Sequence, residues 1–173
     1  VRLLACDNYD ETKDFTRQYV KTFVHENMRN SHLVLESDYP SYNKPFSIKT
    51  YLEVEEDDSE YFVIIDSDMI VRNYIDPSAL GVKQGTVFSS EYEHLVGADN
   101  EFKKRFLVTQ HNVDKVGGIY IVHKSDALNI ATLWFEYTKK VRSFMKENLD
   151  VFLKETLSPS DYQDKKKQEQ AQW

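Results

Sequence analysis

The sequence predicts a layered α/β domain with a mainly parallel sheet. Short apolar runs that are typical of strands, at Val1–Cys6, Tyr61–Ile65, Thr86–Ser90 and Gly118–His123, alternate with stretches of helical spacing. The run Tyr61–Ile65 lacks the alternation of a strand with one solvated face, so we expect an interior strand covered on both faces. The chain has 173 residues, enough for one core but few for two.

The first helical stretches are less regular than the strands. Asp10–Gln18 is polar and compatible with a helix, and Tyr19–His25 either extends that helix or forms a strand. Pro45 stands where the first turn of a helix tolerates proline. The positions after it repeat at three and four residues and predict one buried helix face: Ile48, Tyr51 and Leu52.

The carboxyl-terminal half predicts one long amphipathic helix. Ser125 is a suitable N-cap, and the helix is expected to continue to about Lys154. Its apolar face repeats every three or four residues: Ala127, Ala131, Trp134, Thr138, Val141 and Met145. The polar, lysine-rich end is expected to be a mobile loop or terminus. We therefore expect a core domain over 1–157 and a separate tail over 158–173.

Composition narrows the classes of function. The formal net charge of −7 disfavours a nucleic-acid partner, because phosphates repel an acidic surface. Cys6 is the only cysteine, which excludes an intrachain disulfide and a thiolate zinc site. No stretch approaches the roughly 18 consecutive apolar residues of a transmembrane helix, so we expect no membrane contact by this segment. The chain opens on Val1 without an initiator Met, so we expect an internal piece of a longer protein.

The segment Asp66-Ser67-Asp68 directly after the apolar run Tyr61–Ile65 is the strongest chemical signal. Ligands of open α/β sheets bind outside the carboxyl ends of the strands. Two carboxylates two residues apart lie on one side of an extended backbone, and they repel unless a proton or a cation neutralises them. Mg²⁺ and Mn²⁺ prefer oxygen ligands and leave room for phosphate oxygens. The pattern favours a metal–diphosphate site; the alternative is a turn in which the Asp side chains bond the local backbone.

The segment Tyr61–Val71 resembles the DxD strand of GT-A-fold glycosyltransferases. Further pieces recur in order: Arg2-Leu3-Leu4-Ala5-Cys6, Tyr39-Pro40-Ser41-Tyr42-Asn43-Lys44-Pro45, Asp114-Lys115-Val116-Gly117-Gly118, Trp134 and Val141-Arg142. Together they are similar to the peptidyl-serine α-galactosyltransferases of plants and algae, which are relatives of the hydroxyproline O-arabinosyltransferases. The arabinosyltransferase branch carries a histidine variant of the DxD, so Asp66-Ser67-Asp68 favours the galactosyltransferase side.

The resemblance implies a Mn²⁺ (or Mg²⁺) ion held by Asp66 and Asp68 on the diphosphate of a UDP-sugar. It places Lys44 near the donor phosphates, where a lysine stabilises the charge that the leaving UDP gains. The alternative for Lys44 is a surface lysine beside a helix start.

The resemblance also implies roles in binding the donor sugar for residues of the Asp114–Gly118 segment. Gly117 and Gly118 are expected to let the backbone approach the sugar, because glycine has no Cβ; the alternative is a flexible entry into the next strand. Asp114 is expected to accept a hydrogen bond from a sugar hydroxyl. His123 is a candidate third metal ligand or, more simply, a structural histidine, and Trp134, Phe135 and Tyr137 are interpreted as helix core and rim.

The resemblance implies a retaining transfer of galactose from UDP-galactose to a serine or hydroxyproline hydroxyl of a hydroxyproline-rich protein, in the ER or Golgi lumen. Relatives carry a strand ahead of Arg2 and a catalytic segment beyond Trp173, so we expect the isolated chain to be catalytically incomplete. Two rival hypotheses stay open: a non-catalytic GT-A-like binding module, and a haloacid-dehalogenase-type phosphatase in which Asp66 is the nucleophile and Asp68 the acid/base.

Overall fold

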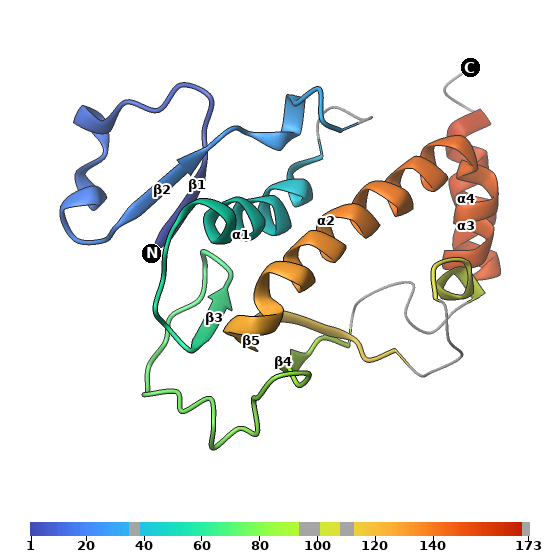
Figure 1. Ribbon diagram of the computed structural model, residues 1–173. Helices are drawn as coiled ribbons and strands as arrows, with labels where there is room; N and C mark the ends of the chain where they lie inside the picture. The colour runs from blue at the N-terminus through green and yellow to red at the C-terminus, as the bar shows by residue number, and fades with distance from the viewer. Residues whose placement is uncertain (35–38, 94–100, 108–112, 171–173) are drawn as a thin grey trace.

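The computed structural model describes residues 1–34, 39–93, 101–107 and 113–170. Within these ranges lie a two-stranded parallel sheet, a three-stranded antiparallel sheet and the helices α1 to α4. Figure 1 shows the parallel pair beside α1, the three-stranded sheet near the start of α2, and α3 and α4 near its far end. The predicted mixture of strands and helices is confirmed. None of the helices in the described ranges combines the length and the apolar composition that a membrane crossing requires.

The parallel pair consists of β1 (Arg2–Ala5) and β2 (Thr22–His25), in register from Arg2 opposite Thr22 to Ala5 opposite His25. The connection contains two short 3₁₀ turns, Glu11–Lys13 and Phe15–Gln18, rather than the helix that its composition allows. Asp10 and Asp14 cap these turns through their side chains.

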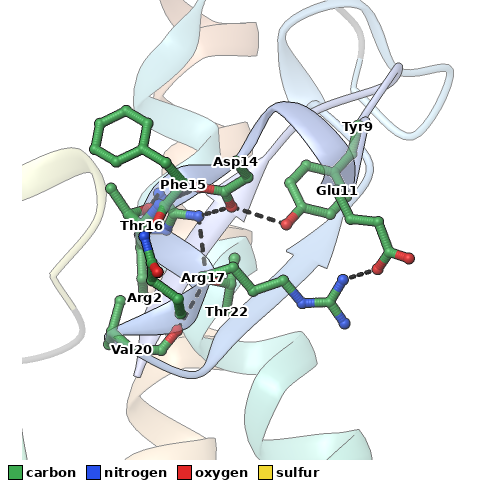
Figure 2. A network of polar contacts seen from close by, with 10 residues as sticks. Arg2, Tyr9, Glu11, Asp14, Phe15, Thr16, Arg17, Val20 and Thr22 are labelled. Carbon is green, nitrogen blue, oxygen red and sulfur yellow. Dashed lines mark hydrogen bonds and ion pairs between the residues drawn. The ribbon is translucent and has the colours of Figure 1, made fainter.

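A cluster of polar side chains fastens this connection to the sheet. The guanidinium of Arg2 donates to Asp14, to the hydroxyl of Thr16 and, at 3.0 Å, to the hydroxyl of Thr22 (Figure 2). The phenol of Tyr9 donates to the same Asp14 carboxylate at 2.8 Å. We call these five residues the Arg2–Asp14 network.

The larger sheet has the order β3 (Tyr61–Ile65), β5 (Val116–His123), β4 (Phe88–Glu91), and both outer strands run antiparallel to β5. The predicted strand at Tyr61–Ile65 is confirmed, but the prediction of a mainly parallel sheet is wrong. The apolar run of β3 was taken as a sign of burial on both faces, whereas Val63 and Ile65 are 40% and 37% exposed. A run of β-branched residues indicates strand propensity but does not fix the direction of its neighbour.

Helix α1 (Asn43–Val54) begins with Pro45 in its first turn, as predicted. Ile48 and Tyr51 of the predicted face are buried, and α1 packs on β1 and β2. The ring of Tyr51 meets Phe23 of β2 edge-on, with centroids 5.5 Å apart. The helix is therefore fixed against the first sheet, and its amino-terminal turn carries Lys44.

Helix α2 (Lys124–Glu147) buries Ala127, Ala131 and Phe135. It starts earlier than predicted: the N-cap is His123, whose Nδ1 accepts from the N–H of Ser125 at 3.2 Å, so Ser125 itself is inside the helix. It also ends earlier, because Asn148 leaves the helical region and donates from its side chain to the Phe144 carbonyl at 3.1 Å.

Two short helices follow, α3 (Leu149–Thr156) and α4 (Pro159–Gln170). The expected loop after 158 is thus a helix over most of its length. The Ser158 hydroxyl accepts from the N–H of Asp161 at 3.2 Å, and Pro159 occupies the first helical position. This start signal, a serine cap followed by proline, was overlooked in a segment that composition marks as polar.

One buried cluster joins α1 and α2 to the segments that precede α1. It consists of Met28, Val34, Tyr42 and Phe135, with Tyr39 and Phe46 packed against it. The Phe135 ring of α2 lies 5.3 Å from Phe46 of α1 and 6.2 Å from Tyr42, between ring centroids. Because α2 also contacts β3 and β5, this packing sets the position of α1 relative to the carboxyl end of β3.

Candidate functional site

Asp66-Ser67-Asp68 lies in a tight turn directly after β3. The N–H of Asp66 donates to the Gly118 carbonyl of β5 at 3.2 Å, which extends the ladder one residue beyond the strand. The N–H of Met69 then donates back to the Asp66 carbonyl at 3.0 Å and closes the turn. The backbone is therefore bent at this point, not extended as the sequence analysis assumed, and Asp66 is anchored by its main chain.

The carboxylates of this turn are not used to stabilise it. Four other Asp side chains in the protein each accept from the N–H two residues ahead: Asp10, Asp14, Asp57 and Asp76. In the described part of the chain, neither Asp66 nor Asp68 makes such a bond. The alternative of a turn held by its Asp side chains thus describes those four positions but not these two.

Lys44 is the partner of Asp66. It stands in the first turn of α1, and its ammonium forms an ion pair with the Asp66 carboxylate, 22 residues further along the chain. The side chains are 28% and 36% exposed, so the pair is open to solvent on one side. Lys44 is consequently not an unattached surface lysine, and the structure brings together two of the residues that the resemblance assigns to the donor.

Two aromatic rings flank the same ammonium. The Nζ of Lys44 lies 5.2 Å from the ring centroid of Tyr120 on β5 and 5.6 Å from that of Trp134 on α2. Burial, and then the nearby charges of Asp66 and Tyr92, raise the pKa of the Tyr120 phenol above its ordinary value of 10. The phenol therefore stays neutral at physiological pH and does not compete with Asp66 for Lys44.

Gly117 and Gly118 serve close packing inside the protein. A Cβ on Gly117 would lie 2.7 Å from the Tyr92 ring, and a Cβ on Gly118 would lie 2.5 Å from the Met69 methyl group. Gly118 also has a φ of +75°, which side chains rarely adopt. It stands at a bulge, since Ser89 pairs with Tyr120 while Ser90 pairs with Gly117. Neither glycine is the flexible strand entry of the alternative interpretation, because both are buried within β5.

The remaining candidates form no hydrogen bond or ion pair with Lys44 or Asp66. Asp114 is exposed just ahead of β5 and makes no hydrogen bond or ion pair with the described residues, so its role stays a prediction. His123 is at the opposite end of β5, paired with Tyr61, and its Nδ1 caps α2. The structural interpretation of His123 therefore fits better than that of a third metal ligand.

The donor set of the turn suits a hard divalent cation. Asp68 is exposed, and Asp66 offers carboxylate oxygen beside a lysine that a cation can displace. Among the residues that the structure describes, no group of three or more His, Cys, Asp or Glu side chains is arranged as a metal site. A cation here would complete its shell with oxygens from water or from a ligand, which is how Mg²⁺ usually binds beside phosphates.

The sequence analysis missed Tyr120 and assigned Trp134 to the helix core and rim. Phe135 is core, at 5% exposed, but Trp134 turns to Lys44 and its ring lies 5.2 Å from that of Tyr120, between centroids. The long separations along the chain between Lys44, Tyr120 and Trp134 gave no local pattern that would have revealed the group.

Comparison with known proteins gives two relatives of the same name. Over 142 residues the chain is 31% identical to the peptidyl serine alpha-galactosyltransferase of Arabidopsis thaliana, and over 157 residues it is 24% identical to that of Chlamydomonas reinhardtii. No family model matches, and no solved structure matches. Each alignment covers 82% of this chain but only 18% and 21% of the relatives. The chain is thus similar over most of its own length to two proteins named as galactosyltransferases, and spans about a fifth of each.

Proposed function

We propose that this chain forms the metal- and donor-binding part of a glycosyltransferase that transfers galactose from UDP-galactose to a peptidyl serine hydroxyl. The observation that carries the proposal is the Lys44–Asp66 pair at the end of β3, with the Asp68 carboxylate left open beside it. Both relatives bear the name of this activity and align with most of the chain, which supports the choice of reaction.

Asp66 and Asp68 hold Mn²⁺ or Mg²⁺ in this proposal, and the bound cation neutralises charge on the donor diphosphate. Lys44 supplies a second positive charge from α1, and this charge stabilises the negative charge of the departing UDP. The apolar rings of Tyr120 and Trp134 limit the water around this lysine and strengthen its interactions.

Several finer features follow from the family resemblance. The donor of such enzymes is α-linked, so an α-galactosyl product implies retention of configuration. We further propose a hydroxyproline-rich acceptor protein, a GT-A-like fold for the complete catalytic domain, and action in the lumen of the secretory pathway. Asp114 and the Gly117–Gly118 backbone are the proposed contacts of the donor sugar.

Calorimetric titration of the 173-residue chain with Mn²⁺ and UDP tests the proposal. UDP should bind in the presence of Mn²⁺, and Asp68→Asn should remove the metal-dependent part, because an amide lacks the charge that a carboxylate gives the cation. Asp58→Asn is the matched control: it makes the same change of charge at an exposed Asp with no hydrogen bond among the described residues. Equal affinity in the unmodified chain and Asp68→Asn would remove Asp68 from the site, and metal-free UDP binding would argue against a cation bridge.

The same titration separates the rival functions. A folded chain that binds neither Mn²⁺ nor UDP would favour a non-catalytic module. A phosphatase would instead form an acid-stable aspartyl-phosphate at Asp66 when incubated with a phosphoryl donor, an outcome that is incompatible with glycosyl transfer at this turn.

A further inference from the structure

The ammonium of Lys44 is held by three groups from three different elements. Asp66 follows β3, Tyr120 belongs to β5 and Trp134 to α2, whereas Lys44 itself is on α1. The two rings lie 5.2 Å apart between centroids, with 54° between their planes. Nζ is within about 6 Å of both centroids, the range in which a ring face attracts a cation.

The ion pair alone does not fix this lysine. An ion pair between partly exposed side chains contributes little, because water screens it and a long flexible side chain loses entropy when it is held. Contacts with two ring faces restrict the same side chain by other means. They also persist when a cation takes Asp66, because they do not depend on its carboxylate.

An apolar cavity lies behind the rings. It has a volume of about 260 Å³ and is lined by Tyr120 and Trp134 together with apolar side chains such as Ile48 and Ala131. Such a lining is almost entirely apolar, and a charge entering it would lose its hydration. Lys44 is therefore directed outward, toward the Asp66–Asp68 turn.

We propose that Tyr120 and Trp134 are positioning residues, whose ring faces hold the Lys44 ammonium beside the Asp66–Asp68 turn so that it meets the donor diphosphate there. The part that concerns the diphosphate rests on the proposed function. The part that concerns the rings is a property of the protein alone, and the two parts have separate tests.

The ring contacts are tested by NMR of the chain with ¹³C-labelled lysine. The ε-methylene protons of a lysine over two ring faces are shielded, so the Lys44 signal should lie upfield of that of an exposed lysine such as Lys13. The signal is assigned by its loss in Lys44→Arg. Trp134→Leu and Tyr120→Leu should each move it back toward the position of the exposed lysine, whereas Tyr120→Phe, which keeps the ring, should leave it in place.

Tyr137 provides the matched control on the same helix. Its ring contacts a different lysine: the Nζ of Lys140 lies 4.8 Å from the centroid of the Tyr137 ring. Tyr137→Leu should therefore shift the Lys140 signal and leave that of Lys44 unchanged. A Lys44 signal at the position of an exposed lysine, or one that Trp134→Leu does not move in a folded protein, would overturn the assignment of the rings.

The diphosphate part is tested by calorimetry with UDP and Mg²⁺. Trp134→Leu should weaken UDP roughly three- to tenfold, the effect of losing one favourable cation–ring contact, and should leave the affinity for Mg²⁺ alone unchanged. Trp134→Phe should restore most of the UDP affinity.

A double-mutant cycle decides whether the ring acts through the lysine. In a Lys44→Ala background, Trp134→Leu should cost no further affinity for UDP, because the group that it positions is gone. Additive losses would mean that Trp134 contacts the nucleotide directly and would overturn the inference. If the unmodified chain shows the shielded lysine but binds no UDP with Mg²⁺, the ring assignment is supported while the diphosphate part and the proposed function both fail.

Discussion

Asp14 and Asp66 each face a basic side chain, and they use their carboxylates differently. Asp14 accepts from the N–H and the hydroxyl of Thr16, from Tyr9 and from Arg2, and its side chain is only 11% exposed. Among the described residues Asp66 has Lys44 as its one side-chain partner, and its side chain is 36% exposed. The Arg2–Asp14 network is a closed set of polar contacts that fastens a loop, whereas the Lys44–Asp66 pair has oxygens left for a ligand.

This difference separates a structural carboxylate from a candidate binding carboxylate. A carboxylate has about four lone-pair sites, and Asp14 has a donor for each. A cation at Asp14 would have to break several of these bonds, while a cation at Asp66 would displace a single ammonium. The predictions below test this contrast, beginning with the largest effect.

The proposed function predicts that Lys44→Ala lowers kcat for galactosyl transfer by about 10²-fold in an active enzyme that contains this chain, with a much smaller change in the donor KM. The reason is that the ammonium interacts most strongly with the UDP charge that develops as the sugar bond breaks. Steady-state kinetics with varied UDP-galactose measures both constants. Lys49→Ala is the control, because Lys49 stands on the same helix and pairs with Glu53 instead of a residue of the Asp66–Asp68 turn. A change confined to KM would reduce Lys44 to ground-state phosphate binding.

The same substitution should affect the Tm strongly at Asp14 and weakly at Asp66. Asp14→Asn should lower the Tm by roughly 3–8 °C, because an amide cannot serve all of the donors around Asp14 and leaves the Arg2 charge without its partner. Asp66→Asn should change the Tm little, since its pair with Lys44 is partly exposed. Thermal unfolding followed by circular dichroism provides both values. Similar losses of Tm in the two variants would mean that the Lys44–Asp66 pair is a structural contact as well.

The sequence predicts the local part of this contrast but not the part that depends on contacts between residues far apart along the chain. The strand Tyr61–Ile65 and the carboxylates that follow it are local features, and the structure has them where they were expected. The direction of the neighbouring strand is not local, so the predicted parallel sheet was wrong. The pairing of Lys44 with Asp66 was approached only through the family resemblance, since no spacing rule joins a helix start to a turn 22 residues later.

The aromatic residues around Lys44 could not be predicted from local sequence patterns for a similar reason. Tyr120 looks like any aromatic residue of a buried strand, and Trp134 fits the apolar repeat of its helix. Their common neighbour Lys44 becomes visible only when β5, α2 and α1 are packed together. Asp14 and Asp66 are likewise indistinguishable as residues in a sequence; the number of donors around each carboxylate distinguishes them, and that number is set by tertiary structure.

Gly118→Ala should destabilise the protein by about 1–2 kcal/mol, because an alanine side chain strains the positive φ. Crowding of the new methyl group against Met69 should add a smaller loss. Gly81→Ala is the matched control, because Gly81 has nearly the same φ of +77° and nothing within 4 Å of an added Cβ. The difference between the two free energies of unfolding, measured in urea, isolates the crowding beside the Asp66–Asp68 turn. Equal losses would show that the Met69 methyl group moves aside without cost.

The smallest expected effect is on how the free energy of unfolding depends on pH. The hydrogen bonds from Thr16 and Tyr9, and then the Arg2 charge, hold the pKa of Asp14 well below its ordinary value of 3.8. A carboxyl whose pKa is lower in the folded state stabilises the protein above its ordinary pKa, and this stabilisation disappears as the pH falls through the lowered value. Tyr9→Phe removes one of the donors and should bring the pKa of Asp14 closer to ordinary. The variant should therefore be less stable than the unmodified protein near neutral pH, and the difference should shrink on acidification.

Urea unfolding at about pH 6, 3 and 1.5 measures that difference directly, because the difference shrinks only as the pH falls through the lowered pKa of Asp14. Tyr19→Phe serves as the control, because Tyr19 is 80% exposed and the same loss of a hydroxyl there should change the free energy of unfolding little at any of these pH values. If the deficit of Tyr9→Phe stays constant from about pH 6 to 1.5, the Tyr9 hydroxyl contributes without depending on the charge of Asp14. The Arg2–Asp14 network would then be held by packing and neutral hydrogen bonds, and the closed character of this carboxylate could not be attributed to its charge.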